Sequence, residues 1–342
     1  MSQFQAHGKF LLTGEYLVLR GALALALPLK FGQSMSVESF PETSPNEKNA
    51  SSETVRETSL QWDAHKPDGH WFSVTLNPEN LEIINSDDQP KAEKLTQILK
   101  AIKQLNPTAF KDGLHFETRL DFDPNWGLGS SSTLIANLAR WANVNPYELL
   151  KLTFGGSGYD IACATAEGPI YYQLASLDCF VPRKSRFDDA KRVNDAKRQS
   201  ETTQKIEPID FNPPFADHLF FIYQGQKQSS SKEIKAFLEK TDPIDLQKDL
   251  EAVSQISRAV PKCEGLDEFA MLMQCHERII AHCIGQEPVQ KRFPDFEGVL
   301  KSLGAWGGDF ILAATEWPES QVKEYFKRKG LDVVFGYKEM LI

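Results

Sequence analysis

The chain has 342 residues, of which 41% are hydrophobic, and a formal net charge of −9 from 47 acidic and 38 basic residues. This length and apolar content are enough for a substantial core and for two domains. The acidic balance argues against the broad positive field that nucleic acid or an anionic membrane would need, so we expect neither as a partner. The longest apolar run, residues 22–29, is too short to cross a bilayer, and no secretory-type leader opens the sequence, so we expect a cytoplasmic protein.

The five cysteines are scattered and contain no CxxC pair, which favours reduced thiols over a disulfide framework. Cys275-His276 and His282-Cys283 lie seven residues apart in one predicted helix. A metal site there is the less favoured alternative, because zinc sites are usually closed by ligands from separate elements.

Residues 8–29 hold two apolar runs separated by glycines, which predicts a strand, a turn and a second strand. Lys9 and Glu15 are the polar exceptions, and burying either charge is costly unless it is paired. We expect both at a polar cleft; the alternative is a pair of strand-end charges in solvent. The pattern then predicts a strand at 34–39, a polar loop at 41–54, a hairpin with its turn at 66–69, a helix at 91–105 and a strand at 114–122.

Residues 124–133, PNWGLGSSST, form a glycine- and serine-rich turn that runs into an amphipathic helix. Glycine lets the backbone approach a ligand closely, and the free N–H groups of a helix's first turn attract anions. Three consecutive hydroxyls add hydrogen-bond donors for phosphate and a hard oxygen ligand for Mg²⁺. The stretch therefore predicts a phosphate site; the alternative is a serine N-cap before an ordinary helix.

Two further glycine turns follow, at residues 155–160 and 303–309. The first ends at Asp160, where a helix is expected to begin, so Asp160 is either an N-cap or a carboxylate aimed at a ligand hydroxyl. The remaining pattern predicts strands at 169–174, 219–223 and 310–314, a polar connection at 182–214, and helices at 231–239, 246–260, 267–284 and 319–329. The basic cluster at 183–198 is expected to be a solvated surface, with a second phosphate site as the alternative.

The three turns carry a resemblance to a known family. Neither the GxGxxG turn of dinucleotide folds nor the P-loop GxxxxGK[ST] is present. GKFLLTGEY at 8–16 instead resembles the first motif of the GHMP kinases, the superfamily of galactokinase, homoserine kinase, mevalonate kinase and phosphomevalonate kinase. PNWGLGSSS at 124–132 matches the family's PxxxGLGSS ATP loop, and GAWGGD at 304–309 resembles its third motif, with Trp306 where a glycine is usual. Gly-Glu-Tyr at 14–16, the turn at 156–160 and Asp309 are most similar to phosphomevalonate kinases, with mevalonate kinase the near neighbour.

The resemblance implies an α/β (α+β) protein with the two-domain GHMP kinase fold. A ribosomal-S5-domain-2-like domain would span residues 1–180, a polar connection 181–214, and a ferredoxin-like domain 215–342. ATP and the acceptor would lie in the cleft between the domains.

The resemblance also implies roles for single residues. Lys9 and Asp160 would be catalytic: Asp160 would act on the acceptor hydroxyl, and Lys9 would pair with Asp160 or with the transferring phosphoryl group. ATP would be held by Pro124, Gly127, Leu128, Gly129, Ser130, Ser131 and Ser132, Mg²⁺ by Ser131 and Glu148, and the acceptor by Glu15, Tyr16, Gly158, Ala305 and Gly307. Glu148 marks a departure, because the segment that supplies a glutamate to Mg²⁺ in mevalonate kinase is short here and contains no other acidic residue.

The implied activity is ATP- and Mg²⁺-dependent transfer of the γ-phosphoryl group to a hydroxyl or phosphate of phosphomevalonate or mevalonate. One alternative is a GHMP kinase for a sugar or sugar phosphate, and another is a non-catalytic homologue that binds ATP or a metabolite as a sensor. Lys9, Ser131 and Asp160 are all present, which favours catalysis. The expected partners are ATP and a small-molecule acceptor, and a homodimer is left open.

Overall fold

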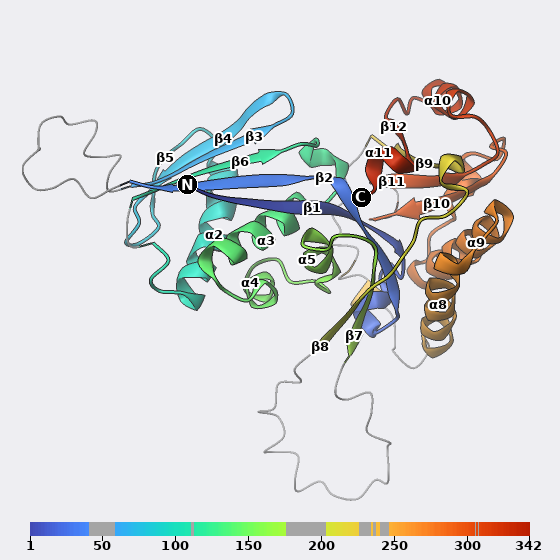
Figure 1. The fold of residues 1–342 in the computed structure, drawn as a ribbon, viewed down its shortest axis with the longest axis horizontal. Coiled ribbons are helices and arrows are strands. Elements are labelled where there is room, and N and C mark those ends of the chain that lie inside the picture. Colours follow the sequence, from blue (N-terminus) through green and yellow to red (C-terminus); the bar gives the residue numbers. More distant parts are fainter. Residues whose placement is uncertain are drawn as a thin grey trace, which may run out of the picture.

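The computed structural model describes residues 1–40, 59–110, 113–175, 203–225, 234, 237–239, 246–304, 306 and 308–342. These residues form one eight-stranded and one four-stranded β-sheet, each with its own helices (Figure 1). The predicted loop at 41–54, the basic cluster at 183–198 and most of the predicted helix at 231–239 lie outside the described residues. Among the helices described, none is both long and apolar enough to cross a membrane.

The first sheet has the strand order β5-β4-β3-β6-β2-β7-β8, and β1 pairs with β2 beside this path. Its strands are β1 Ser2–Thr13, β2 Ala24–Ser39, β3 Leu60–Lys66, β4 Gly69–Leu76, β5 Ile83–Ser86, β6 Leu114–Leu120, β7 Ile170–Ala175 and β8 Thr203–Pro208. The β3–β6 pair is parallel, and the other pairs are antiparallel. The long strand β2 pairs with β6 through residues 33–39 and with β7 through residues 24–26, so it holds the two halves of the sheet together.

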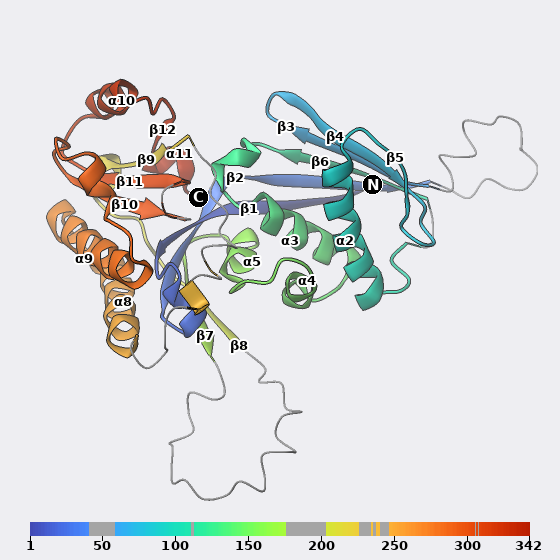
Figure 2. The ribbon, with the colours of Figure 1, turned by 180° about the vertical axis from the view of Figure 1, so that it is seen from behind.

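Four helices lie together on one face of this sheet, as both ribbon views show (Figures 1 and 2). They are α2 Gln89–Leu105, α3 Ser130–Ala142, α4 Pro146–Thr153 and α5 Tyr159–Ala164. α2 starts where the Asp88 carboxylate accepts a hydrogen bond from Lys91 N at 3.1 Å, and it ends at Asn106, before a proline. The rings of Trp62 and Phe116 stack at 5.1 Å in the core between sheet and helices. The predicted hairpin, helix and strand in this region are confirmed.

The second sheet has the order β10-β11-β9-β12 and is antiparallel throughout. Its strands are β9 Leu219–Tyr223, β10 Val299–Leu303, β11 Phe310–Ala314 and β12 Val334–Gly336. α8 Gln247–Ala259 and α9 Leu266–Ile284 connect β9 to β10, α10 Glu319–Arg328 connects β11 to β12, and α11 Tyr337–Met340 follows. This succession and strand order are those of a ferredoxin-like unit.

One hydrophobic core joins the two sheets. The ring of Phe10 in β1 stacks on Phe221 of β9 at 5.0 Å and meets Phe310 of β11 edge-on at 5.1 Å. Leu29 at β2 also forms a backbone bridge with Leu341 near the C-terminus. This packing brings the end of β1 alongside β10, so groups from both sheets meet there.

The structure differs from the predicted elements in three places. Leu17–Arg20 forms a short 3₁₀ helix, η1, where a strand was expected, because Gly14 and Gly21 adopt positive φ values of 96° and 91° and turn the chain twice. The predicted strand at 34–39 is the end of the continuous strand β2. The described part of the predicted connection contains β8, which pairs with β7 in the first sheet.

Candidate active site

β1 lies directly against the glycine turn that precedes α3. Lys9 N donates to Leu128 O at 3.0 Å, and its side-chain Nζ donates to Gly127 O at 3.0 Å. A Cβ at Gly8 would lie 2.9 Å from Leu128 O, so only glycine lets the two backbones approach this closely. Lys9 is therefore fixed to the turn by both its backbone and its side chain.

The turn presents the start of α3 without a side-chain cap. Gly127 and Gly129 have φ values of 72° and 98°, and Gly129 itself is the N-cap. The serine N-cap alternative is therefore wrong; Ser132 Oγ donates to Gly129 O at 2.8 Å instead. The first N–H groups of a helix have no partner within it, and here the capping residue has no side chain to offer one. Ser130–Ser132 thus provide first-turn amides, with the Ser131 side chain exposed.

Asp309 connects this turn to the third glycine turn. A Cβ at Gly127 would lie 2.5 Å from Asp309 Cγ, and a Cβ at Gly304 would lie 2.6 Å from its Oδ2. Gly304 also has a positive φ, 76°. The Asp309 carboxyl group, 5% exposed, therefore fills the space that side chains at these two glycines would need.

Asp160 is the second residue of α5, and the N-cap is Gly158 with φ 86°, so the N-cap alternative for Asp160 is wrong. Its Oδ1 accepts a hydrogen bond from Ile161 N at 3.1 Å. Burial raises the pKa of Asp160, and the positive charge of Lys9 acts in the opposite direction. The lysine is thus close enough to lower the pKa of the Asp160 carboxyl group.

Gly158 is placed by two aromatic side chains. A Cβ there would lie 3.0 Å from the Tyr147 ring and 3.2 Å from the Tyr172 hydroxyl. Burial, followed by the Asp160 charge, raises the pKa of Tyr147 to about 12. A side chain at Gly158, the N-cap of α5, would therefore collide with these two tyrosines.

A cavity of about 80 Å³ lies next to Lys9. Glu15, Tyr16, Ser157, Tyr159 and Gly304 contribute to its lining, and the Tyr159 ring centroid is 5.9 Å from Lys9 Nζ. A larger hollow of about 730 Å³ runs along the outer edge of β1, but none of the predicted site residues lines it. The smaller cavity is therefore the candidate acceptor site.

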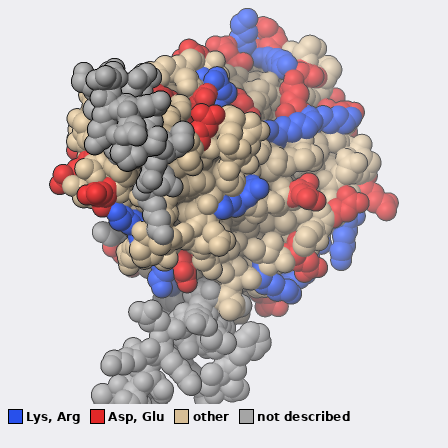
Figure 3. Space-filling view, turned by 60° about the vertical axis from the view of Figure 1, so that its left-hand side comes forward, with Lys and Arg blue, Asp and Glu red and all other residues tan. Residues whose placement is uncertain are grey.

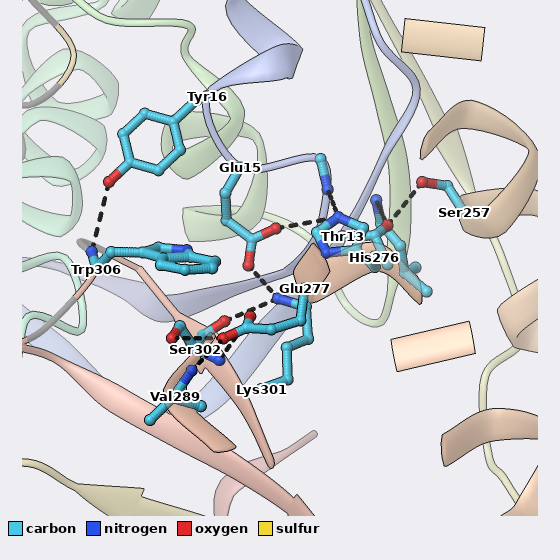
Figure 4. A network of polar contacts seen from close by, with 12 residues as sticks. Thr13, Glu15, Tyr16, Ser257, His276, Glu277, Val289, Lys301, Ser302 and Trp306 are labelled. Carbon is cyan, nitrogen blue, oxygen red and sulfur yellow. Dashed lines mark hydrogen bonds and ion pairs between the residues drawn. The ribbon is translucent and has the colours of Figure 1, made fainter. Parts of the chain in front are cut away.

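Glu15 belongs to a buried polar network behind this cavity (Figure 4). Its carboxylate, 3% exposed, accepts a hydrogen bond from the Lys301 ammonium, which also donates to Ser302 O at 2.8 Å. His276 Nε2 accepts from Gly14 N at 2.8 Å and lies 3.4 Å from Glu15 Oε2. Burial raises the pKa of Glu15 to about 7, although the Lys301 charge opposes this.

Glu277 forms the second carboxylate of the network. It accepts hydrogen bonds from Val289 N at 3.0 Å, Ser302 N at 3.1 Å and Ser302 Oγ at 3.0 Å. No role was predicted for Lys301 or Glu277, and His276 was considered only as a metal ligand. A signal for Lys301 was present, because it is a lone lysine in an apolar run, as Lys9 is.

Tyr16 is held between the two parts of the site. Its hydroxyl accepts a hydrogen bond from Trp306 N at 3.4 Å, and its ring lies 5.7 Å from Phe237. Its φ of 59° is unusual for a residue other than glycine, so the surroundings impose this conformation. The two other predicted acceptor residues, Ala305 and Gly307, lie outside the described residues.

The predicted metal residues lie on two helices. Ser131 is exposed in the first turn of α3, and Glu148 is exposed in the first turn of α4. Their hydroxyl and carboxylate oxygens are the hard donors that Mg²⁺ prefers. Within the described part of the chain, no three His, Cys, Asp or Glu side chains are grouped to hold a metal ion.

The sequence carries a formal net charge of −9, with 47 acidic and 38 basic residues. On the face shown in Figure 3, Lys and Arg side chains lie among Asp and Glu side chains and wide uncharged areas. A bound anion at the candidate site would therefore depend on backbone amides and single cations such as Lys9.

No family model and no curated protein matches the sequence. Solved structures match nearly the whole chain. L. major mevalonate kinase, in complex with R-mevalonate, aligns with a TM-score of 0.62 and 15% identity over 98% of this chain and 95% of its own. S. pneumoniae phosphomevalonate kinase, in complex with phosphomevalonate and AMPPNP, aligns with a TM-score of 0.64 and 15% identity over 98% of this chain and 100% of its own. L. lactis galactokinase, complexed with galactose, aligns with a TM-score of 0.58 and 11% identity over 99% of this chain and 93% of its own.

The chain therefore has the two-domain α/β fold of the GHMP kinases, as the sequence motifs predicted. At these identities the likeness shows the fold alone.

Proposed function

We propose that the protein is a kinase that transfers the γ-phosphoryl group of ATP to a small-molecule acceptor. The main support is the position of Lys9. Its Nζ donates a hydrogen bond to Gly127 O in the glycine turn, and its positive charge lowers the pKa of Asp160. A cation placed between a phosphate-binding turn and a carboxylate is the arrangement that phosphoryl transfer needs, since that reaction depends on positioning and charge neutralisation.

The nucleotide end of the site is the turn before α3. The uncapped amides of Ser130–Ser132 and the close backbone approach at Gly127 and Gly129 suit a triphosphate. The S. pneumoniae phosphomevalonate kinase that shares this fold was solved in complex with AMPPNP. Ser131, with Glu148 as a second oxygen donor, would hold Mg²⁺, which when bound neutralises phosphate charge.

The acceptor end is the cavity beside Lys9. Asp160 would take the proton of the attacking oxygen of the acceptor, whether that oxygen belongs to a hydroxyl or to a protonated phosphate, and its raised pKa makes it a better proton acceptor than an ordinary aspartate. Lys9 would keep Asp160 ionised in the resting enzyme and stabilise the phosphoryl oxygens during transfer. Glu15 and Tyr16 would contact the acceptor from the cavity wall.

For the acceptor we propose phosphomevalonate or mevalonate. The sequence motifs resemble those of the kinases for these two compounds, and kinases solved in complex with each of them share the fold. The galactokinase match supports a sugar or sugar phosphate as the second candidate.

An ADP-release assay with mevalonate, phosphomevalonate, galactose and homoserine tests the proposal. We expect turnover with mevalonate or phosphomevalonate, and turnover with galactose alone would favour the second candidate. Calorimetric binding of ATP together with no phosphorylated product from any of the four would support a nucleotide sensor and reject the kinase.

A further inference from the structure

Lys301 is a buried lysine that the proposed mechanism does not use. It lies in β10 of the second sheet and is 1% exposed. Its ammonium donates to the Glu15 carboxylate and to Ser302 O. A buried ammonium is strongly disfavoured unless it is paired and hydrogen-bonded, so Lys301 and Glu15 form one unit although they come from different sheets.

Glu15 lies where this buried unit meets the cavity. It follows Gly14, whose φ of 96° turns the chain away from the end of β1. It contributes to the same cavity wall as Lys9 and Tyr159. The Glu15 side chain is 3% exposed, so an acceptor held at Lys9 would lie beside the small part of it that lines the cavity.

The other ionisable groups near Glu15 have separate roles. Glu277 accepts its three hydrogen bonds from Val289 and Ser302. His276 accepts from Gly14 N, and burial holds its pKa well below the usual range, so its ring is neutral and fixes the backbone before Glu15. Lys301 is the cation that faces Glu15 among the residues labelled in Figure 4.

We infer that Lys301 is a positioning residue of the proposed reaction, which holds the Glu15 carboxyl group in place and favours its ionised form at the acceptor end of the cavity. The inference rests on the proposed function. An ionised carboxylate accepts hydrogen bonds from acceptor hydroxyls more strongly than a neutral carboxyl group does. Lys301 lines neither the cavity nor the nucleotide turn, so its effect on the reaction passes through Glu15. Because Lys301 lies in β10, a residue of the second sheet thereby helps to position the acceptor-binding residue that follows β1.

A kinetic double-mutant cycle tests this dependence. The wild type, Lys301→Met, Glu15→Gln and the double variant are compared with the acceptor that the wild type turns over. We expect Lys301→Met to raise the acceptor KM by about tenfold or more, with the ATP KM nearly unchanged, and to have little further effect once Glu15 is glutamine. An equal effect in both backgrounds would overturn the inference, because a purely structural lysine acts without Glu15.

The pH profile separates positioning from general damage. Lys9, Tyr16 and Tyr159 face Glu15 in the cavity and His276 and Glu277 face it from α9, and all five remain in the Lys301→Met variant. Loss of the ammonium removes an influence that lowers the pKa of Glu15. The acid limb of kcat/KM for the acceptor should therefore move to higher pH, and an unmoved limb contradicts the inference.

A direct titration of Glu15 needs no activity. In protein labelled with ¹³C-glutamate, the Glu15 carboxyl signal, assigned by its loss in Glu15→Gln, should titrate near pH 7 in the wild type and higher in Lys301→Met. An unshifted midpoint overturns the inference whatever the activity. If the Glu15 midpoint shifts but the protein phosphorylates none of the tested acceptors, the proposed function is rejected while the dependence of Glu15 on Lys301 stands. If Lys301→Met does not fold, Lys301→Gln, which keeps hydrogen-bond donors, provides the same comparison.

Discussion

The Asp309 carboxyl group occupies the space beside Gly127 in which a side chain would lie: a Cβ at Gly127 would be 2.5 Å from Asp309 Cγ. Gly127 lies in the turn before α3, and Asp309 comes directly before β11 of the second sheet. The candidate nucleotide site is thus shaped by side chains from both sheets, and its glycine is required for space as well as for conformation.

Gly127→Ala should therefore lower ATP affinity by about tenfold or more, because the methyl group displaces Asp309 and the turn together. Calorimetry with ATP measures the loss. Gly285→Ala is the matched control, since Gly285 ends α9 with a similar φ of 69° and no atom within 4 Å of an added Cβ. Both variants carry the backbone strain, so equal ATP affinities in the two would contradict a close approach at Gly127.

Lys9→Met should reduce turnover by about a hundredfold or more while ATP affinity changes little, because the α3 amides remain. The variant should also shift the acid limb of turnover to higher pH, since Lys9 lowers the pKa of Asp160. Steady-state kinetics between pH 5 and 9 measures both effects.

Lys30→Met is the control for Lys9→Met. Lys30 is an exposed lysine of β2 that donates to Lys338 O, away from the cavity lining. Equal turnover in the two variants would show that Lys9 has no special part in the reaction.

Glu15 makes a pH-dependent contribution to stability. Its pKa is about 7 in the folded protein and 4.5 as the ordinary value, so the folded state binds the proton more tightly. This contribution is fully present below pH 4.5 and is lost as the pH rises through about 7, with a slope of up to ~1.4 kcal/mol per pH unit. The difference in unfolding free energy between wild type and Glu15→Gln, measured with urea from pH 4.5 to 8, should change in this window. A constant difference would contradict the raised pKa.

The motifs predicted the fold well because each one marks a turn of the backbone. PNWGLGSSST predicted a glycine turn and a helix, and both are present with the expected positive φ values at Gly127 and Gly129. The hairpin at 66–69 and the helix at 91–105 were predictable from turn chemistry and apolar spacing. The short elements β5, α4 and β12 carry too few residues for such a pattern.

The site was less predictable where partners come from distant parts of the chain. Lys9 was identifiable as a charge in an apolar run, but its bond to Gly127 joins residues 118 positions apart. The Glu15–Lys301 pair joins residues 286 positions apart, and local spacing carries no information on such a contact. The N-cap of α5, for which Asp160 was one alternative, lies at Gly158, where glycine adopts the positive φ that the turn needs.

The Asp160→Asn variant tests whether Asp160 acts in phosphoryl transfer. Because burial disfavours the charged form of Asp160, the neutral amide should fold with a stability within ~1 kcal/mol of the wild type, and ATP affinity should hardly change. Turnover with the acceptor should fall on the order of 10²- to 10⁴-fold, since the group that takes the proton of the attacking oxygen is gone. Turnover, urea unfolding and ATP calorimetry on the same preparation measure all three quantities. A folded, ATP-binding Asp160→Asn protein with wild-type turnover would contradict the central claim that Asp160 acts in phosphoryl transfer.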